Sequence, residues 1–152
     1  MEKLDKTDRK ILSVLQEEGR ITTKELAEKI HLTNTPVYER VKKLEKNGII
    51  QKYAAMLDPE KIDRSMIIFL MVSLTKHTKD VVEEFKKEVL DIPEVMEFYY
   101  ISGNYDSLLK IMVKDMEQFK VFIEEKLSNI NHITQFQSIF VISGEEKTSF
   151  EL

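Results

Sequence analysis

The residues between Thr33 and Lys46 include the side chains of this sequence best suited to contacting nucleic acid. Arg40 and Lys43 are three residues apart, so on a helix they would lie on one face and could bind DNA phosphates. The hydroxyl, amide and phenol groups just before them suit the edges of bases. The predicted DNA-contacting residues are Thr23, Thr33, Asn34, Thr35, Pro36, Tyr38, Glu39, Arg40, Lys42, Lys43 and Lys46.

Local charge supports a DNA-binding surface in this region. Residues 20–52 contain eight Lys and Arg but four Asp and Glu, whereas the whole chain has a net charge of −4. A basic patch in an acidic protein is typical of a segment that meets a polyanion. A helical hairpin with a basic face that only contacts solvent is the alternative interpretation.

The elements around these side chains have the signals of a helix-turn-helix. Thr22 and Glu25 have the spacing of a capping box, which predicts a helix start. A second helix is expected to begin at Thr35-Pro36, because proline suits the first helical position, and to end at Asn47-Gly48. Two adjacent helices of this kind allow the second to lie in the major groove of DNA.

A further helix is expected ahead of these two, from Asp5 to Glu18, with Gly19 ending it. Asp8, Leu12 and Leu15 have the spacing of one packed face. Short extended segments are expected at 49–50 and 53–55. Three helices followed by such segments predict a compact, winged-helix-like domain.

Bulk composition indicates a folded protein with two functional parts. The chain has 152 residues, 42% hydrophobic and 33% charged, which is typical of a globular protein. Residues 1–62 hold 13 basic and 11 acidic residues, whereas residues 63–152 hold 10 and 16. We therefore expect a DNA-binding domain with its hinge at 1–62 and a second domain at 63–152.

Several function classes find no support in the sequence. No cysteine is present, so thiolate metal sites and disulfides are excluded. The N-terminus has no secretory signal, and the longest apolar run, Met66–Val72, is too short to span a membrane. We expect a cytoplasmic protein without a metal or cofactor.

The second part alternates strands and helices in the order βαββαβ, which predicts a ferredoxin-like sandwich of four antiparallel strands covered by two helices. The expected strands are Met66–Leu74, Val95–Ser102, Ser107–Lys114 and His132–Ile142, the expected helices Lys79–Leu90 and Asp115–Leu127, and the tail Gly144–Leu152 is expected to be irregular. Because Met66–Leu74 is apolar at nearly every position, the face of the sheet without helices must be covered. We expect a homodimer to cover it.

Three segments together resemble the Lrp/AsnC family, the leucine-responsive or feast/famine regulators. LDKTDRKILSVLQEEGRIT is similar to the opening helix of that family, LTNTPVYERVKKLEKNGIIQKY to its recognition helix and hinge, and ISGNYDSLLKIMV to its Gly-x-Tyr-Asp effector signature. The resemblance implies a transcription regulator that binds double-stranded DNA. It also implies dimers that assemble further, possibly to octamers, with a small effector, commonly an amino acid, bound between dimers.

Carried over to this sequence, the resemblance implies that Gly103, Asn104, Tyr105, Asp106, Thr134 and Ser138 bind the effector. An aspartate suits the ammonium of an amino acid, and glycine lets backbone N–H groups approach its carboxylate. An ordinary hairpin turn, with the aspartate as its cap, is the alternative interpretation of this loop. Ser107 stands where members of the family often carry a bulky residue.

A tetrapyrrole-decarboxylating enzyme and an architectural DNA-binding protein are the alternative functions. Some proteins of this two-part build decarboxylate a tetrapyrrole with histidines, but His31, His77 and His132 have no catalytic or metal-binding spacing. An architectural protein that binds DNA with little sequence preference is the second alternative. An architectural protein is distinguished from a sequence-specific regulator by the ratio of specific to non-specific affinity at fixed salt.

Overall fold

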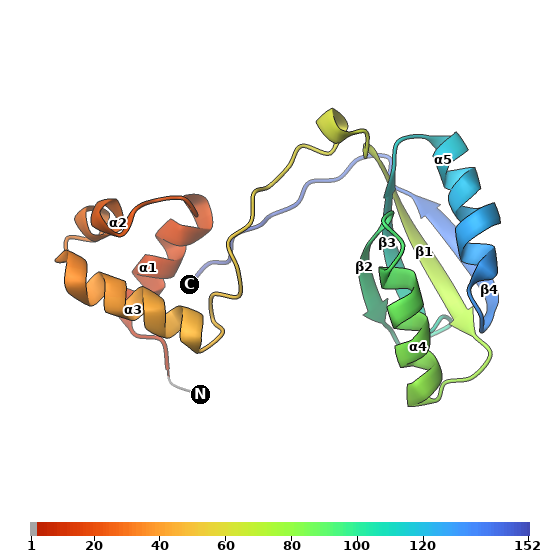
Figure 1. Cartoon of the computed structure of the whole chain (residues 1–152), viewed down its shortest axis with the longest axis horizontal. Helices are drawn as coiled ribbons and strands as arrows, with labels where there is room; N and C mark the ends of the chain where they lie inside the picture. Colours follow the sequence, from red (N-terminus) through yellow and green to blue (C-terminus); the bar gives the residue numbers. More distant parts are fainter. Residues whose placement is uncertain (1–2) are drawn as a thin grey trace. The chain divides into compact units, whose positions relative to one another are not determined.

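The computed structural model describes residues 3–152, which divide into two compact units. The first contains residues 3–56 together with Glu145–Leu152, and the second contains Leu57–Gly144 (Figure 1). The boundary therefore lies before the expected one after Ile62. The C-terminal residues, which were expected to belong to the second domain, group with the first.

Three helices form the first unit: α1 (Lys6–Glu17), α2 (Thr23–Lys29) and α3 (Asn34–Lys46). Asp5 caps α1 and Thr22 caps α2, each in a capping box with the residue three positions on. The expected box of Thr22 and Glu25 is confirmed: the Thr22 backbone N–H donates to Glu25 at 2.9 Å, and the Glu25 N–H donates to Thr22 Oγ1 at 3.3 Å.

The expected start of α3 at Thr35-Pro36 is wrong by two residues. Thr33 is the N-cap, with extended backbone angles, and Asn34 is the first helical residue. Pro36 is accommodated at the third position because the first four N–H groups of a helix have no intrahelical acceptor to lose.

The core of the first unit gathers one face from each helix, with the buried residues Ile11, Leu12, Leu26, Ala27, Ile30, Val37 and Leu44. Leu15 packs against it, as its spacing predicted, and so does Val41. Asp8, which was expected on the packed face of α1, is 19% exposed at its side chain, and its carboxylate pairs with Arg40 of α3. Residues 3–65 contain no β-strand, so the extended segments expected at 49–50 and 53–55 are irregular.

The second unit contains the expected βαββαβ order. After a short 3-10 helix, Glu60–Ile62, come β1 (Met66–Leu74), α4 (Lys79–Leu90), β2 (Val95–Tyr100), β3 (Ser107–Val113), α5 (Met116–Val121) and β4 (Ile133–Phe140). The sheet is antiparallel throughout, in the order β2-β3-β1-β4. The last three strands are each slightly shorter than expected.

Helix α5 departs from the single helix expected over Asp115–Leu127. Asp115 is its N-cap, but from Phe122 to Lys126 the chain forms a π-helix and then a short 3-10 turn, Leu127–Asn129. The wider π turn ends at Lys126, whose Nζ lies 2.6 Å from a carboxylate oxygen of Glu94, a residue only 5% exposed. This pair ties the end of the helix to the start of β2.

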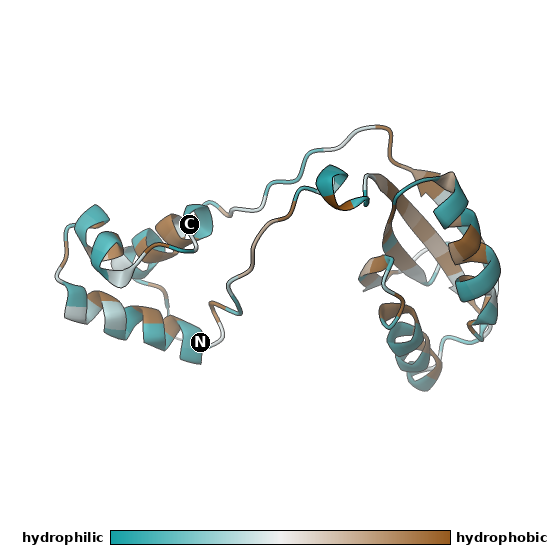
Figure 2. Ribbon diagram, turned by 45° about the horizontal axis from the view of Figure 1, so that its top comes forward, coloured by the Kyte–Doolittle hydropathy of each residue, from teal (hydrophilic) through white to brown (hydrophobic). Residues whose placement is uncertain are grey.

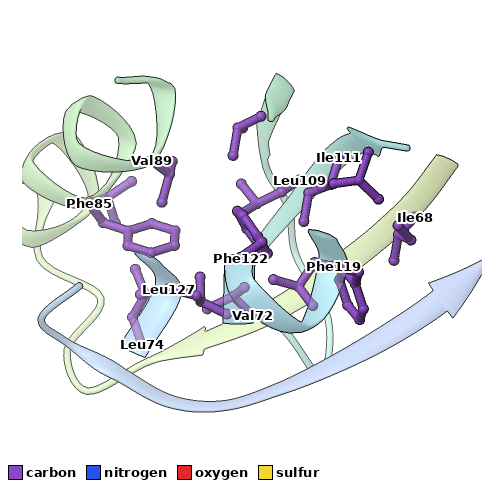
Figure 3. Packing of buried hydrophobic residues seen from close by; sticks show 14 residues of the cluster. Ile68, Val72, Leu74, Phe85, Val89, Leu109, Ile111, Phe119, Phe122 and Leu127 are labelled. Atoms are coloured by element: carbon purple, nitrogen blue, oxygen red, sulfur yellow. The ribbon is translucent and has the colours of Figure 1, made fainter. Parts of the chain in front are cut away.

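Both helices of this unit cover one face of the sheet, and the second core lies between them (Figure 3). Alternate residues of β1 and β3 point into it against Phe85 and Val89 of α4 and Phe119 and Phe122 of the α5 segment. The fully buried hydrophobic residues of the strands are Ile68, Leu70, Val72, Leu109, Ile111 and Val113.

The opposite face of the sheet has no helix and remains apolar. Ile67, Phe69 and Met71 of β1 are only half-buried there, and Ile139 of β4 is 43% exposed. Figure 2 shows the strands in hydrophobic colours, whereas the helices alternate between hydrophobic and hydrophilic turns. Among residues 3–152, no helix is long and apolar enough to cross a membrane.

Candidate DNA interface and effector loop

The turn between α2 and α3 is closed by backbone hydrogen bonds. The Leu32 N–H donates to the carbonyl oxygen of Ala27 at 2.9 Å, and His31 has a φ of 58°. A positive φ is uncommon outside glycine, and histidine is among the residues that tolerate it better. The turn leads directly to Thr33, so the start of α3 is held at a fixed angle to α2.

The N-terminal half of α3 presents the predicted base-reading residues to solvent. Thr33, Asn34, Thr35 and Tyr38 are all exposed, while Val37 between them is fully buried. Pro36, Glu39, Lys43 and Lys46 are also exposed. These side chains can therefore reach a groove without disturbing the core.

Arg40, which was predicted to contact DNA, is held within the unit by two carboxylates. Its Nη1 lies 2.7 Å from a carboxylate oxygen of Asp5 and 2.7 Å from one of Asp8. These bonds raise the pKa of Arg40, and the Asp8 N–H and the guanidinium lower the pKa of Asp5. Arg40 thus links α3 to the cap of α1 and is only 36% exposed at its side chain.

Lys42 is also partly neutralised. Its Nζ lies 3.0 Å from Glu45 and 5.8 Å from the ring centre of Tyr38, and Glu45 also accepts a hydrogen bond from Tyr53. The Glu45 carboxylate raises the pKa of Lys42, and Lys42 in turn lowers the pKa of Glu45. Thr23, predicted on α2, is half-buried at the first position of that helix.

The predicted effector loop joins β2 to β3. Gly103 has a φ of 136°, a value that side chains rarely permit, so this position requires glycine. A Cβ built at Gly103 would meet no atom within 4 Å. The constraint is therefore backbone conformation and not crowding, which leaves room for a ligand to approach.

Asp106 is the most firmly held residue of this loop. Its N–H donates to the Val72 carbonyl at 2.9 Å, and its carbonyl accepts from the Ile101 N–H at 2.8 Å. One carboxylate oxygen, Oδ2, accepts the Leu74 N–H at 2.8 Å, and the other lies 2.7 Å from Nδ1 of His77. The aspartate thus has a capping role as well as the charge that suits an ammonium.

Tyr105 and Asn104 reach the neighbouring strands. The Tyr105 hydroxyl donates to Gln137 at 2.9 Å, and the Asn104 carbonyl accepts from Ser73 at 3.5 Å. Thr134 belongs to the same group of residues around the loop, which we call its rim, because the Thr134 hydroxyl donates to the Ser73 carbonyl at 3.1 Å. Ser73, His77 and Gln137 were missed by sequence reasoning, since no spacing in the sequence connects them to the loop.

Ser138 is not brought to this rim. It pairs with Leu70, which points into the helix-covered core, and opposed residues of an antiparallel pair share a face. The adjacent Gln137, which binds Tyr105, therefore faces the other way. Within one chain, the sheet separates Ser138 from Tyr105.

Two further features adjoin the loop. Ser107 is fully buried, and its hydroxyl has no hydrogen-bond partner among the described residues. Thr134 also borders a hollow of about 450 Å³ between β4 and the end of the α5 segment, lined mainly by Ile123, Leu127, Ile130, Ile133 and Phe136. In residues 3–152, no group of three or more His, Asp or Glu could hold a metal ion.

Both units of the chain match known families. Residues 4–51 match the winged helix-turn-helix DNA-binding family, and residues 67–149 match the Lrp/AsnC ligand binding domain. The leucine-responsive regulatory proteins of Klebsiella pneumoniae and Escherichia coli K12 are each 37% identical over 149 residues, which cover 98% of this chain and 90% of the relative.

Solved structures agree with these matches. A transcriptional regulator of Neisseria meningitidis in complex with L-methionine is 39% identical, with a TM-score of 0.89 over 97% of this chain and 95% of the other. An AsnC family regulator of Agrobacterium tumefaciens is 32% identical, with a TM-score of 0.91 over 98% and 97%. AsnC of Escherichia coli, at 23% identity and a TM-score of 0.88 over 98% and 99% of the two chains, shares the fold.

Proposed function

Because this chain belongs to the Lrp/AsnC family of transcriptional regulators, we propose that an amino acid bound near Asp106 controls how α3 engages DNA. The chain is a DNA-binding regulator with a ligand-binding domain, and not an enzyme. One observation supports the proposal most directly. The same chain contains a helix-turn-helix whose recognition face is exposed and a ligand-binding unit in which the Asp106 carboxylate is held by a backbone hydrogen bond. A regulator acts on chromosomal DNA, so we place it in the cytoplasm.

DNA contact is assigned to α3, with its N-terminal half in the major groove. We assign base reading to Thr33, Asn34, Thr35 and Tyr38, whose exposure supports it. We assign phosphate contacts to Lys43 and Lys46. Lys42 would contribute less to DNA affinity, because it already pairs with Glu45. The remaining candidates, Thr23, Pro36 and Glu39, would border the groove.

Arg40 is assigned a double role. Both of its bonds to Asp5 and Asp8 are made by Nη1, so a phosphate would be approached by the other end of the guanidinium. Two carboxylates near the guanidinium weaken its attraction for a phosphate. We therefore rank Arg40 below the exposed Lys46 as a source of DNA affinity.

The effector is assigned to the loop Gly103–Asp106, with Thr134 at its rim. The Asp106 charge suits an α-ammonium, and the glycine conformation lets the backbone approach the α-carboxylate. Two of the relatives named above are leucine-responsive regulatory proteins and another was solved with L-methionine, and we propose an apolar amino acid of this size. Ser138 could contribute only from another copy of the chain.

The helix-free face of the sheet is assigned to a homodimer. Ile67, Phe69 and Met71 form an apolar row at its centre, beside the 2.9 Å ion pair of Lys110 with Glu97. A second copy of the same face would bury this row by a symmetric contact. Assembly of such dimers to an octamer follows the family resemblance.

The test is recovery of sheared genomic DNA by the purified protein, with and without L-leucine or L-methionine. The proposal expects a few enriched fragments whose recovery changes when the amino acid is added. Uniform recovery of all fragments would instead establish an architectural protein, and unchanged recovery would remove the effector.

A further inference from the structure

The two carboxylate oxygens of Asp106 have different partners. One accepts a backbone hydrogen bond, and the other lies beside a side chain that is outside the predicted site. Oδ2 accepts the Leu74 N–H at 2.8 Å, which fixes the orientation of the group. The backbone of Asp106 is bound on both sides, to Val72 and Ile101. The position opposite Oδ1 is therefore well defined, and it is the position that a cation bound by this aspartate would take.

His77 occupies that position. Its Nδ1 lies 2.7 Å from Oδ1, and it belongs to the segment 75–78 that joins β1 to α4. The His77 side chain is 68% exposed, whereas that of Asp106 is only 16% exposed. The imidazole therefore covers the carboxylate from the solvent side and can leave without disturbing the core.

We propose that His77 is an internal competitor for the ammonium-binding position and must leave Asp106 before an amino acid binds. This inference rests on the proposed function of the loop. An imidazole N–H and an α-ammonium are both donors that can bind Oδ1, so they cannot occupy this position together. A protonated imidazole would also repel the ammonium. His77 thus lowers effector affinity and sets the effector concentration at which the regulator responds.

The size of the effect follows from the exposure of the His77 side chain. Contacts made by a charged group that is largely in solvent are weak, so removal of His77 should tighten amino-acid binding by about two- to fivefold. The displaced segment 75–78 leads directly into α4, which begins at Lys79. Effector binding would accordingly release a connection between the loop of Asp106 and the start of that helix.

The experiment is calorimetric titration of the full chain with L-leucine and L-methionine, as wild type, as His77→Ala and as His132→Asn. His132 is the matched control: it is a nearby histidine that contacts Thr75 and pairs with Glu84 at 3.6 Å. Its φ is 72°, a conformation that asparagine tolerates. Each protein is also titrated with 4-methylpentanoate, which has the apolar chain and carboxylate of leucine but no ammonium.

We expect His77→Ala to bind the amino acids about threefold more tightly, with 4-methylpentanoate and His132→Asn unchanged. Unchanged or weaker amino-acid binding by His77→Ala overturns the inference while leaving the proposed function intact. Equal tightening for 4-methylpentanoate overturns it too, because the effect would not involve the ammonium. If the wild type binds neither L-leucine nor L-methionine, the proposed function and this inference both fail.

Discussion

The side-chain amide of Gln16 pairs with the backbone of Phe150 through two hydrogen bonds. The Phe150 N–H donates to Gln16 Oε1 at 2.7 Å, and Gln16 Nε2 donates to the Phe150 carbonyl at 3.2 Å. Gln16 lies on α1, so the C-terminal segment is held against the DNA-binding unit. Phe150 and Leu152 also line a hollow there with Leu12 and Leu15.

Replacing Gln16 by leucine should release this segment. The variant loses both bonds, so we expect the Phe150 amide to exchange with solvent about five- to thirtyfold faster, the factor that one to two ordinary hydrogen bonds provide. Hydrogen exchange measured by NMR tests this, with Glu17→Gln as the control on the neighbouring exposed residue. Unchanged exchange at Phe150 would mean that the pairing contributes nothing in solution.

Lys46→Ala and Arg40→Ala should separate DNA affinity from folding. Lys46→Ala is expected to reduce the salt slope of DNA binding by about one and to leave stability unchanged, because it removes one phosphate contact of an exposed side chain. Arg40→Ala is expected to lower the thermal midpoint as well, because Asp5 and Asp8 lose their shared partner. Affinity measured over a salt series, beside thermal unfolding, distinguishes the two. A normal midpoint for Arg40→Ala would contradict its structural role.

Asp106→Asn should remove the effector response without unfolding the protein. Asparagine retains an oxygen for the Leu74 N–H but has no charge for an ammonium, so amino-acid affinity should fall by about tenfold or more. Asp106→Ala loses the acceptor too and should be the less stable variant. Calorimetry and thermal unfolding measure the two effects, and full effector affinity in Asp106→Asn would reduce the aspartate to a turn residue.

Ser107→Ala should be neutral or stabilising, by up to about 1 kcal/mol, because the buried hydroxyl has no partner to lose. Ser73→Ala is the matched control, since the Ser73 hydroxyl bonds to Asn104 and Gln135 at the same rim. Urea unfolding gives both values. Clear destabilisation by Ser107→Ala would show that its hydroxyl is bound in solution.

Acid should lower the stability of the DNA-binding unit by protonating Glu25 in the capping box of α2. Hydrogen bonds from the hydroxyl and N–H of Thr22 lower the pKa of Glu25 below its ordinary value of 4.5. Because the unfolded chain then binds protons more readily, this stabilisation is complete above pH 4.5 and is lost as the pH falls through the folded pKa. The protection factors of the α2 amides, which are corrected for the slower intrinsic exchange at low pH, should therefore fall in the wild type as the pH is lowered from 6. Glu25→Gln should show a smaller change with pH.

Local signals in the sequence predicted most of the fold. Thr22 with Glu25, and Asp115 before α5, lie within a few residues of the N–H groups that they cap, so their roles can be read from spacing. The start of α3 was misplaced because Thr33 is also a good cap and Pro36 fits more than one position of a first turn. The π turn after Val121 has no sequence signature.

Only those residues of the candidate site that are neighbours in the sequence could be predicted. The loop at 103–106 was identified by its glycine and aspartate, but its partner His77 belongs to the segment that follows β1, the strand paired with β3. The bonds of Arg40 to Asp5 and Asp8 likewise join residues 35 and 32 positions apart. Such pairings are set by how elements pack, and neither helical nor strand periodicity contains that information.

The position of β4 at the edge of the sheet has a consequence for handling the protein. Ile133–Phe140 contains no charged residue, proline or glycine, and one side of its backbone has no neighbouring strand within the described sheet. Charges and prolines are the usual protection of such an edge against pairing with other chains. With Phe136, Ile139 and Phe140 each 43% exposed, this strand has the composition of an aggregation-prone segment. Assembly that covers it would keep the regulator in solution as much as it would position its DNA-binding helices.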